Sequence, residues 1–303
     1  MEQIPANHES QYFGGVVGVQ TLKIKLHAPS AHYRIPHSSN PHCTYPVPPY
    51  STVIGILCNI LGNKDTIQEF LAVDFGLGML SHYESLTREY VWYRNLNQQQ
   101  HKRRYNTVSN RRWQERPDHP GGQSPVSVEV LNEVELNIYL MHRMEFLKVI
   151  TKNLLHPERW FNHIHLGRSE DWAWPVRAQI INLEVSREPA MSRNAGKYFQ
   201  WIPRPEYCWD ITATHDYIEY YKSCKGTLTL VSNKYHYVLP STGKLSSSSA
   251  GAIRNFTYIK AKMSAAPVSF LKPAVLPELY VDPAEHCPVH FARIEGEGEN
   301  ASC

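Results

Sequence analysis

The sequence predicts an α+β fold whose strands and helices follow the order β-α-β-β-α-β. Three observations support this: apolar residues alternate in some segments and recur with helical spacing in others, prolines gather between the first strand and the first helix, and a polar insert separates the middle strands. Hydrophobic residues make up 42% of the chain and charged residues 19%, so it can bury a core. This order of elements is that of the ferredoxin-like fold, which RNA-recognition domains share.

The first half of this domain is expected to contain one strand, one loop and one helix. A broken alternation of apolar residues predicts a strand over residues 16–26. Six prolines exclude a helix from the loop that follows, residues 27–50. A helix is expected over residues 51–61, with Ser51 or Thr52 accepting hydrogen bonds from its first free N–H groups.

The second half is expected to supply the remaining strands and the second helix. Residues 77–94 and 126–142 have extended character, and residues 178–185 form another candidate strand. Residues 144–155 have the apolar spacing of a helix that stops before Pro157.

The whole chain is expected to divide into a larger and a smaller unit. Residues 12–205 form the ferredoxin-like domain, and residues 95–125 are an insertion into it. Residues 206–295 form a smaller β-rich extension, because short apolar segments there are separated by Ser, Gly and Pro. Residues 296–303 are expected to be a flexible tail. The candidate strands of the extension are 226–231, 236–239, 256–262 and 289–294.

The composition argues against a membrane protein and against a disulfide-rich protein. The first residues lack the basic and apolar regions of a signal peptide, and the longest apolar stretch, Val53–Leu61, is too short to span a bilayer. Six cysteines without a C-x-x-C pair do not form the pattern of a zinc ribbon or a disulfide scaffold. We therefore expect a soluble, cytoplasmic protein with no cofactor and no metal.

The insert is the most positively charged part of the chain. Seven Lys or Arg residues and one acid lie between Arg94 and Arg116, a charge of +6 over 23 residues, whereas the whole chain carries +3. Cations that neutralise phosphates, interleaved with aromatic rings for unstacked bases, are typical of single-stranded RNA binding. A solvated charged loop is the alternative. The residues expected to contact RNA are Arg94, His101, Lys102, Arg103, Arg104, Arg111, Arg112 and Trp113.

The proline-rich loop contains four histidines at a spacing of five residues: His27, His32, His37 and His42. This spacing fits neither one face of a strand nor one face of a helix. We expect these histidines to contact RNA or solvent rather than a metal.

The segment Tyr45–Leu57 leads from this loop into the first helix. Its prolines stiffen the chain before the helix, whose N-terminal N–H groups form a ready anion site. Gly55, on the first turns, would let another backbone approach closely. We expect the insert and this helix start to close together around one RNA strand.

Two motifs resemble those of CRISPR-associated protein family five (Cas-five), a subunit of type I Cascade complexes. Tyr45-Pro46-Val47-Pro48-Pro49 with Gly55-Ile56-Leu57 resembles the family's Tyr-Pro-x-Pro-Pro-x-Ser/Thr-x-x-Gly-Leu-Leu pattern. Leu166-Gly167-Arg168-Ser169-Glu170-Asp171 is similar to its Leu-Gly-Arg-x-Glu-Asp segment. Val238-Leu239-Pro240 with Arg254-Asn255-Phe256 is a third, weaker similarity. The type I-B branch is the most similar.

The resemblance implies a ferredoxin-like fold of the RRM or RAMP type, whose insertion is a thumb. It implies a non-catalytic subunit that grips the 5′ handle of the CRISPR RNA (crRNA) and contacts the large and backbone subunits, with target DNA near its flanking motif as a further contact. The residues that would lie near the handle are Arg34, Tyr45, Ser51, Thr52, Gly55 and Arg168. Glu170 and Asp171 are expected to be structural, pairing with Arg168 or capping.

Two alternatives remain open at this point. One branch of the family cuts precursor RNA without metal through Tyr, Lys and His, and the candidates here are Tyr45, Tyr50, His101 and Lys102. The other alternative is a protein scaffold without an RNA role. The aromatic segments Tyr90–Tyr93 and Trp172 to Trp174 are expected to lie in the core or in a subunit interface.

Overall fold

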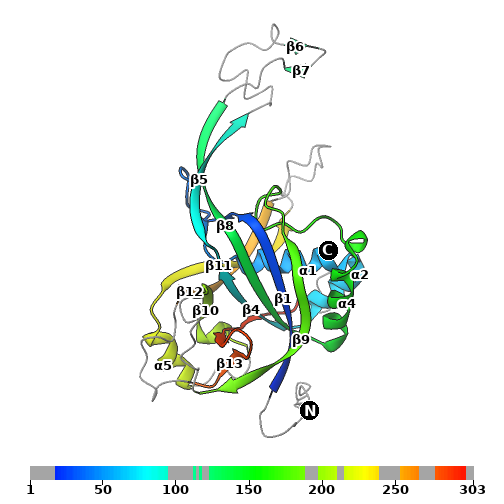
Figure 1. Cartoon of the computed structure of the whole chain (residues 1–303), viewed down its shortest axis with the longest axis vertical. Coiled ribbons are helices and arrows are strands. Elements are labelled where there is room, and N and C mark those ends of the chain that lie inside the picture. The colour runs from blue at the N-terminus through cyan, green and yellow to red at the C-terminus, as the bar shows by residue number, and fades with distance from the viewer. Residues whose placement is uncertain are drawn as a thin grey trace.

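The computed structural model describes residues 18–94, 112–113, 116–117, 123–187, 197–209, 215–238, 253–265 and 277–297. The protein is a mixed α and β structure whose sheets are antiparallel, as the sequence predicts (Figure 1). Eight strands form one large sheet and three form a smaller one.

The large sheet has four central strands in the order β9-β1-β8-β4. They are β1 (Gly18–Ala31), β4 (Phe75–His82), β8 (Gln123–Met141) and β9 (Trp174–Ser186). All of the pairs between them are antiparallel. The predicted strands 16–26, 126–142 and 178–185 are thus confirmed with shifted ends, and β1 and β9 are longer than expected. The predicted segment 77–94 is instead divided, and only its first part, β4, lies among the central strands.

The last three strands extend the same sheet instead of forming a separate layer. They are β13 (Leu279–Asp282), β14 (Cys287–Val289) and β15 (Ala292–Ile294). β13 pairs with β9 at one edge, and β15 pairs with β4 at the other. The expected boundary between residues 205 and 206 therefore does not coincide with a boundary of the sheet, because the end of the chain returns to both edges.

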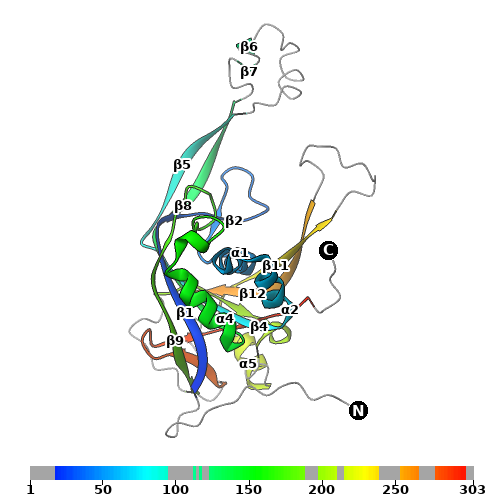
Figure 2. The same cartoon turned by 90° about the vertical axis from the view of Figure 1, so that its right-hand side faces the viewer.

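Three helices cover one face of the large sheet (Figure 2). They are α1 (Tyr50–Leu61), α2 (Lys64–Ala72) and α4 (Met144–Leu154). Alternate apolar residues of β1 and β8, such as Ile24 and Ile138, share one buried cluster with Leu57 of α1 and Leu147 of α4. Gly62 ends α1 in the left-handed conformation at φ 67°, which glycine adopts without strain.

A second, smaller sheet packs on the other side of α1. It consists of β10 (Gln200–Pro203), β11 (Thr227–Val238) and β12 (Ile253–Ser264), in the order β10-β12-β11. Buried Val231 and Ile259 of this sheet belong to the same core as α1. Helix α5 (His215–Ser223) buries three tyrosines, and two single turns lie at η1 (Pro157–Arg159) and η2 (Pro205–Tyr207). The sequence did not predict β10, β13 or α5.

An antiparallel ribbon projects from the body of the protein (Figure 1). It pairs β5 (Ser85–Arg94) with the first half of β8. A ten-residue strand spans about 30 Å at ~3.4 Å per residue, so the ribbon reaches well beyond the sheet. Two short hairpins complete the fold: β2 (Tyr33–Arg34) with β3 (Thr44–Tyr45), and β6 (Arg112–Trp113) with β7 (Arg116–Pro117).

None of the helices in the described ranges has the length and apolarity that crossing a bilayer requires.

Candidate nucleic-acid interface

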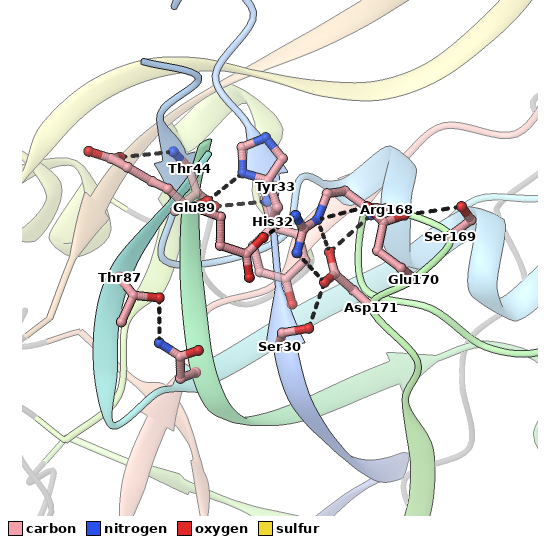
Figure 3. Close-up of polar contacts among 12 residues, drawn as sticks. Ser30, His32, Tyr33, Thr44, Thr87, Glu89, Arg168, Ser169, Glu170 and Asp171 are labelled. Carbon is pink, nitrogen blue, oxygen red and sulfur yellow. Dashed lines mark hydrogen bonds and ion pairs between the residues drawn. The ribbon is translucent and has the colours of Figure 1, made fainter. Parts of the chain in front are cut away.

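Four segments far apart in the sequence meet where the ribbon leaves the body, a place that we call the ribbon root (Figure 3). They are the end of β1, the β2–β3 hairpin, the β5–β8 pair and the loop 166–171. His32 N donates to Leu166 O at 3.1 Å, and Thr44 N donates to Glu129 Oε2 at 3.2 Å. Gly167, at φ 104°, lies so close to the His32 backbone that a Cβ would collide with it.

Arg168 holds the ribbon root together through carboxylates. Its Nε and Nη2 donate to the two oxygens of Asp171 at 2.8 and 2.7 Å, and its Nη1 donates to Glu89 on the ribbon at 2.9 Å. The Asp171 side chain is fully buried and also accepts from Ser30 at 2.6 Å. These bonds to Asp171 and then to Glu89 raise the pKa of the guanidinium. Arg168 therefore ties the ribbon to the loop 166–171 at its root.

The expected pairing of Arg168 with Asp171 is present, and Glu170 lies 3.6 Å from the same guanidinium. The Arg168 side chain is 17% exposed, so most of it is committed to these carboxylates. A direct contact of Arg168 with RNA stays a prediction.

The histidines of the loop have separate structural surroundings. Burial lowers the pKa of His32, whose Nδ1 lies 2.7 Å from Glu129 O, so its imidazole is neutral near pH 7. His42 bonds through its backbone to Ser127 and Glu129 of β8. His27 packs on Trp174 with ring centroids 4.8 Å apart. Among the described residues, no cluster of three or more His, Cys, Asp or Glu is suited to a metal ion.

The start of α1 differs from the expectation in its cap. The N-cap residue is Pro49, and Thr52 N and Val53 N donate to Pro49 O. The expectation that Ser51 or Thr52 caps the helix is wrong, because Pro49 pre-sets the turn and Ser51 already lies inside the helix. Ser51 Oγ instead lies 2.7 Å from Ser232 Oγ of β11, so it joins α1 to the smaller sheet.

The proline-rich segment is fixed by the smaller sheet. Trp201 Nε1 donates to Pro48 O at 2.8 Å, and the Tyr45 ring packs edge-on against Trp201 at 5.4 Å. Tyr45 is half-buried, which raises its pKa. Tyr50 is 1% exposed within the core. A side chain so deeply buried does not reach RNA.

Gly55 and Arg34 are both exposed. Apart from Gly55, its two neighbours and the nearby backbone of its own helix, no described atom lies within 4 Å of the place that a Cβ on Gly55 would take. The expected close approach of a backbone is therefore not made within this part of the chain. Thr52 is partly exposed beside Gly55 on the first turns of α1.

The ribbon carries an exposed stripe in a segment that was expected to lie in the core or in a subunit interface. Leu86, Arg88, Tyr90 and Trp92 alternate along β5, so they share one face. Tyr90 is 77% exposed and Trp92 57%, so the core interpretation of this segment is wrong. Trp172 and Trp174 are also exposed. The alternation of large side chains along residues 86–92 was the only sequence signal that they share one face. Whether that face is buried depends on the elements packed against the strand, which the sequence does not show.

The predicted basic insert starts at the outer end of this ribbon. Arg94 is the last residue of β5 and pairs with Gln123, while Arg112 and Trp113 form β6 beyond the end of the ribbon (Figure 1). His101, Lys102, Arg103, Arg104 and Arg111 lie outside the described residues. Helix α1 lies in the body, so the described residues do not form the groove predicted between the insert and the start of α1. The reason is the length of the β5–β8 ladder, which the sequence did not reveal.

A family model described as CRISPR-associated protein (Cas_Cas5) matches residues 21–223, a range that contains both Tyr45–Leu57 and Leu166–Asp171. No curated protein matches the chain.

Solved structures with low sequence identity are similar to the chain. One, described as "CRISPR RNA-guided surveillance complex", has 11% identity and a TM-score of 0.46, covering 86% of this chain and 91% of that one. A second, "Crystal structure of Cas protein", has 13% identity and a TM-score of 0.38 over 85% and 98% of the two chains. A third, "Crystal structure of a CRISPR protein from Archaeoglobus fulgidus", has 11% identity and a TM-score of 0.35 over 91% and 99%.

Proposed function

The chain belongs to the CRISPR-associated protein family Cas5, and from this premise we propose that it is the subunit of a type I Cascade complex that grips the 5′ handle of the crRNA. The premise follows from the family model, which matches most of the chain. In this proposal the partners are the crRNA, the large subunit and the backbone subunits, and target DNA is contacted near its flanking motif. The complex is a cytoplasmic antiviral ribonucleoprotein, and type I-B is the subtype that the motifs favour.

The observation that carries the proposal is the projecting ribbon with its exposed Arg88, Tyr90 and Trp92. Because Arg168 anchors the root of the ribbon, the ribbon can contact an RNA strand while the body of the protein stays in place. Exposed aromatic rings stack on unpaired bases, and cations neutralise phosphates. The basic insert begins where this stripe ends, so charge and stacking surface follow one another along the same projection.

The arrangement of the central strands supports a ferredoxin-like domain of the RRM or RAMP type. Numbered by their order in the β-α-β-β-α-β series, β1, β4, β8 and β9 lie in the sheet order 4-1-3-2. β1 and β4 run parallel to each other with antiparallel β8 between them, and β8 and β9 run parallel with antiparallel β1 between them. Helices on one face of the sheet connect the parallel strands. In this interpretation the ribbon and its insert are the thumb.

The test of RNA binding uses the full chain and a single-stranded RNA with the sequence of its own CRISPR repeat. We expect binding that weakens with salt, with a slope of log affinity against log salt of about −0.7 for each phosphate neutralised. Replacing Trp92 with Ala is expected to weaken binding about tenfold, because one base loses its stacking partner. Fluorescence anisotropy measures both effects.

The matched control is Trp172→Ala, which removes a similarly exposed Trp outside the ribbon. It is expected to change the affinity less than twofold. Equal loss in both variants, or equal affinity for a scrambled RNA, would contradict handle recognition by the ribbon. No binding at low salt would favour a protein scaffold without an RNA role.

We propose that the subunit is not an enzyme. Tyr50 is 1% exposed within the core, and burial raises the pKa of both Tyr50 and Tyr45, so neither phenol is suited to act as a general base. Repeat RNA incubated with the protein in EDTA is therefore expected to stay intact on a denaturing gel. Cutting at one site that is lost in His101→Ala would instead establish the alternative, a metal-independent endoribonuclease that processes precursor RNA with His101 and Lys102.

A further inference from the structure

The hairpin of β11 and β12 carries large apolar side chains on both of its faces. Its inner face buries Val231, Ile259 and Ala261 against α1. An antiparallel sheet with one solvated face ordinarily places polar side chains on the outside. Here the outer face instead exposes large apolar side chains: Leu228 at 60%, Leu230 at 59%, Tyr258 at 48% and Tyr235 at 40%.

Three aromatic rings lie together on this outer face. Tyr235 pairs directly with Phe256 across the two strands, so both side chains share a face, and Tyr258 follows two residues later on β12. The ring centroids of Tyr235 and Phe256 are 5.7 Å apart, and those of Phe256 and Tyr258 are 6.5 Å apart. Exposed Lys260 continues the same face beyond Tyr258 and pairs with Leu230.

We propose that Tyr235, Phe256 and Tyr258 form a second site for single-stranded RNA, on which bases stack while Lys260 meets a phosphate. This rests on the proposed function, because it assigns a further part of the RNA to the same subunit. Two aromatic residues two positions apart on one strand, with a third on the neighbouring strand, are the arrangement by which RNA-recognition sheets stack two or three bases.

The position of the hairpin agrees with this assignment. In Figure 2, the β5–β8 ribbon and the β11–β12 hairpin rise on opposite sides of α1 and the β2–β3 hairpin. Ser232 of β11 is bonded to Ser51 of α1, so the hairpin is joined to the helix start that the proposed function places near the handle. One strand of RNA that crosses the start of α1 can therefore contact both projections.

A protein partner is the competing occupant of this face. The two ends of the face differ in the kind of partner that their side chains suit. Leu228 and Leu230 lie toward α5 and suit an apolar protein surface, whereas the three rings lie toward the free end of the hairpin. Lys260, opposite Leu230, lies between the leucines and the rings. Aromatic rings beside a cation are what single-stranded nucleic acid requires. We therefore assign the aromatic end to RNA.

The experiment compares three double variants of the full chain with the repeat RNA already described. Tyr235→Ala with Tyr258→Ala is expected to weaken binding about tenfold or more, because stacking on two rings is lost. Tyr235→Phe with Tyr258→Phe retains the rings and is expected to stay within twofold of the unmodified protein. Leu228→Ala with Leu230→Ala is also expected to stay within twofold. None of these changes alters a charge, so the salt slope should not change.

Each outcome decides between the two occupants. If the unmodified protein binds the RNA and the Tyr-to-Ala variant binds equally well, this second site is refuted and the proposed function stands. If the unmodified protein does not bind RNA, both are refuted. If the Tyr-to-Ala and Leu-to-Ala variants keep full RNA affinity but no longer co-assemble with the other subunits, the face is a protein interface. Thermal unfolding of each variant confirms that an affinity loss is not a folding defect.

Discussion

Reversal of the charge of four arginines in the basic insert is expected to weaken RNA binding by at least about a hundredfold. The residues are Arg103, Arg104, Arg111 and Arg112, each replaced by Glu. Every phosphate that is no longer neutralised keeps its counterion, and each new carboxylate repels the backbone of the RNA. The salt slope should fall by about 0.7 for each such phosphate, which separates a phosphate role from a general loss of structure.

The fold is expected to survive this change, because the ladder between β5 and β8 closes at Arg94 and Gln123, before the altered residues. The matched control replaces four exposed basic residues of the helical face with Glu, so the net charge changes equally: Lys64, Arg143, Lys148 and Lys152. This control should retain nearly the full affinity at physiological salt. If it loses as much as the insert variant, the effect is one of total charge and the insert is not the RNA-binding segment.

The largest effect on stability is expected from Lys23→Met. Lys23 Nζ donates to Asp282 at 2.6 Å and to Glu285 at 2.9 Å, and Tyr139 also donates to Asp282 at 2.6 Å. The Lys23 side chain is 8% exposed and that of Asp282 is fully buried. Removal of Lys23 leaves the buried Asp282 carboxylate without a counter-charge, which costs about 3–5 kcal/mol. We expect the free energy of unfolding to fall by that amount in urea denaturation.

Lys25→Met is the matched control, two residues away on the same strand and face. Lys25 pairs with Glu135 at 3.2 Å, but both side chains are about 30% exposed (29% and 31%). A solvated pair of this kind contributes about 1 kcal/mol or less. Equal destabilisation by the two substitutions would mean that the Lys23 cluster does not tie β13 to the centre of the sheet.

The pH dependence of Lys23→Met follows from the carboxylates. Burial raises the pKa of Asp282, but hydrogen bonds from Lys23 and Tyr139 outweigh it and hold the pKa below its ordinary value. The pKa of Glu285 is lowered in the same way by Tyr198 and Lys23. A lowered pKa in the folded protein stabilises it above the unfolded value, about 4, and this contribution is lost as the pH falls through the folded pKa. The difference between the variant and the unmodified protein should therefore shrink as the pH falls through the folded pKa values of Asp282 and Glu285.

The elements that the sequence predicts well are those with a long regular pattern. The spacing of Val53, Leu57 and Ile60 predicts α1 to within one residue at its start, and the alternation along β8 predicts that strand. β10 and β13 have four residues each, too few for a period to be recognised. The tyrosine-rich helix α5 lacks the aliphatic spacing by which α1 is recognised, because its buried residues are Tyr217, Tyr220 and Tyr221.

The candidate site was predictable where a local motif determines it. The motif Leu166–Asp171 suggested that Arg168 pairs with Asp171, and the prolines before Tyr50 indicated the start of α1. The link from Arg168 to Glu89 was not predictable, because it joins residues 79 positions apart. Neither was the exposure of Tyr90 and Trp92, which depends on how far the ribbon extends beyond the sheet.

The central claim is that this chain holds the 5′ end of a CRISPR RNA, and RNA that copurifies with it from its own cells tests this most directly. Sequencing of the 5′ ends is expected to show one uniform end within the repeat, present in every RNA irrespective of the spacer that follows. Copurified RNA with scattered 5′ ends, or a protein that does not touch RNA within the assembled complex, would contradict the account.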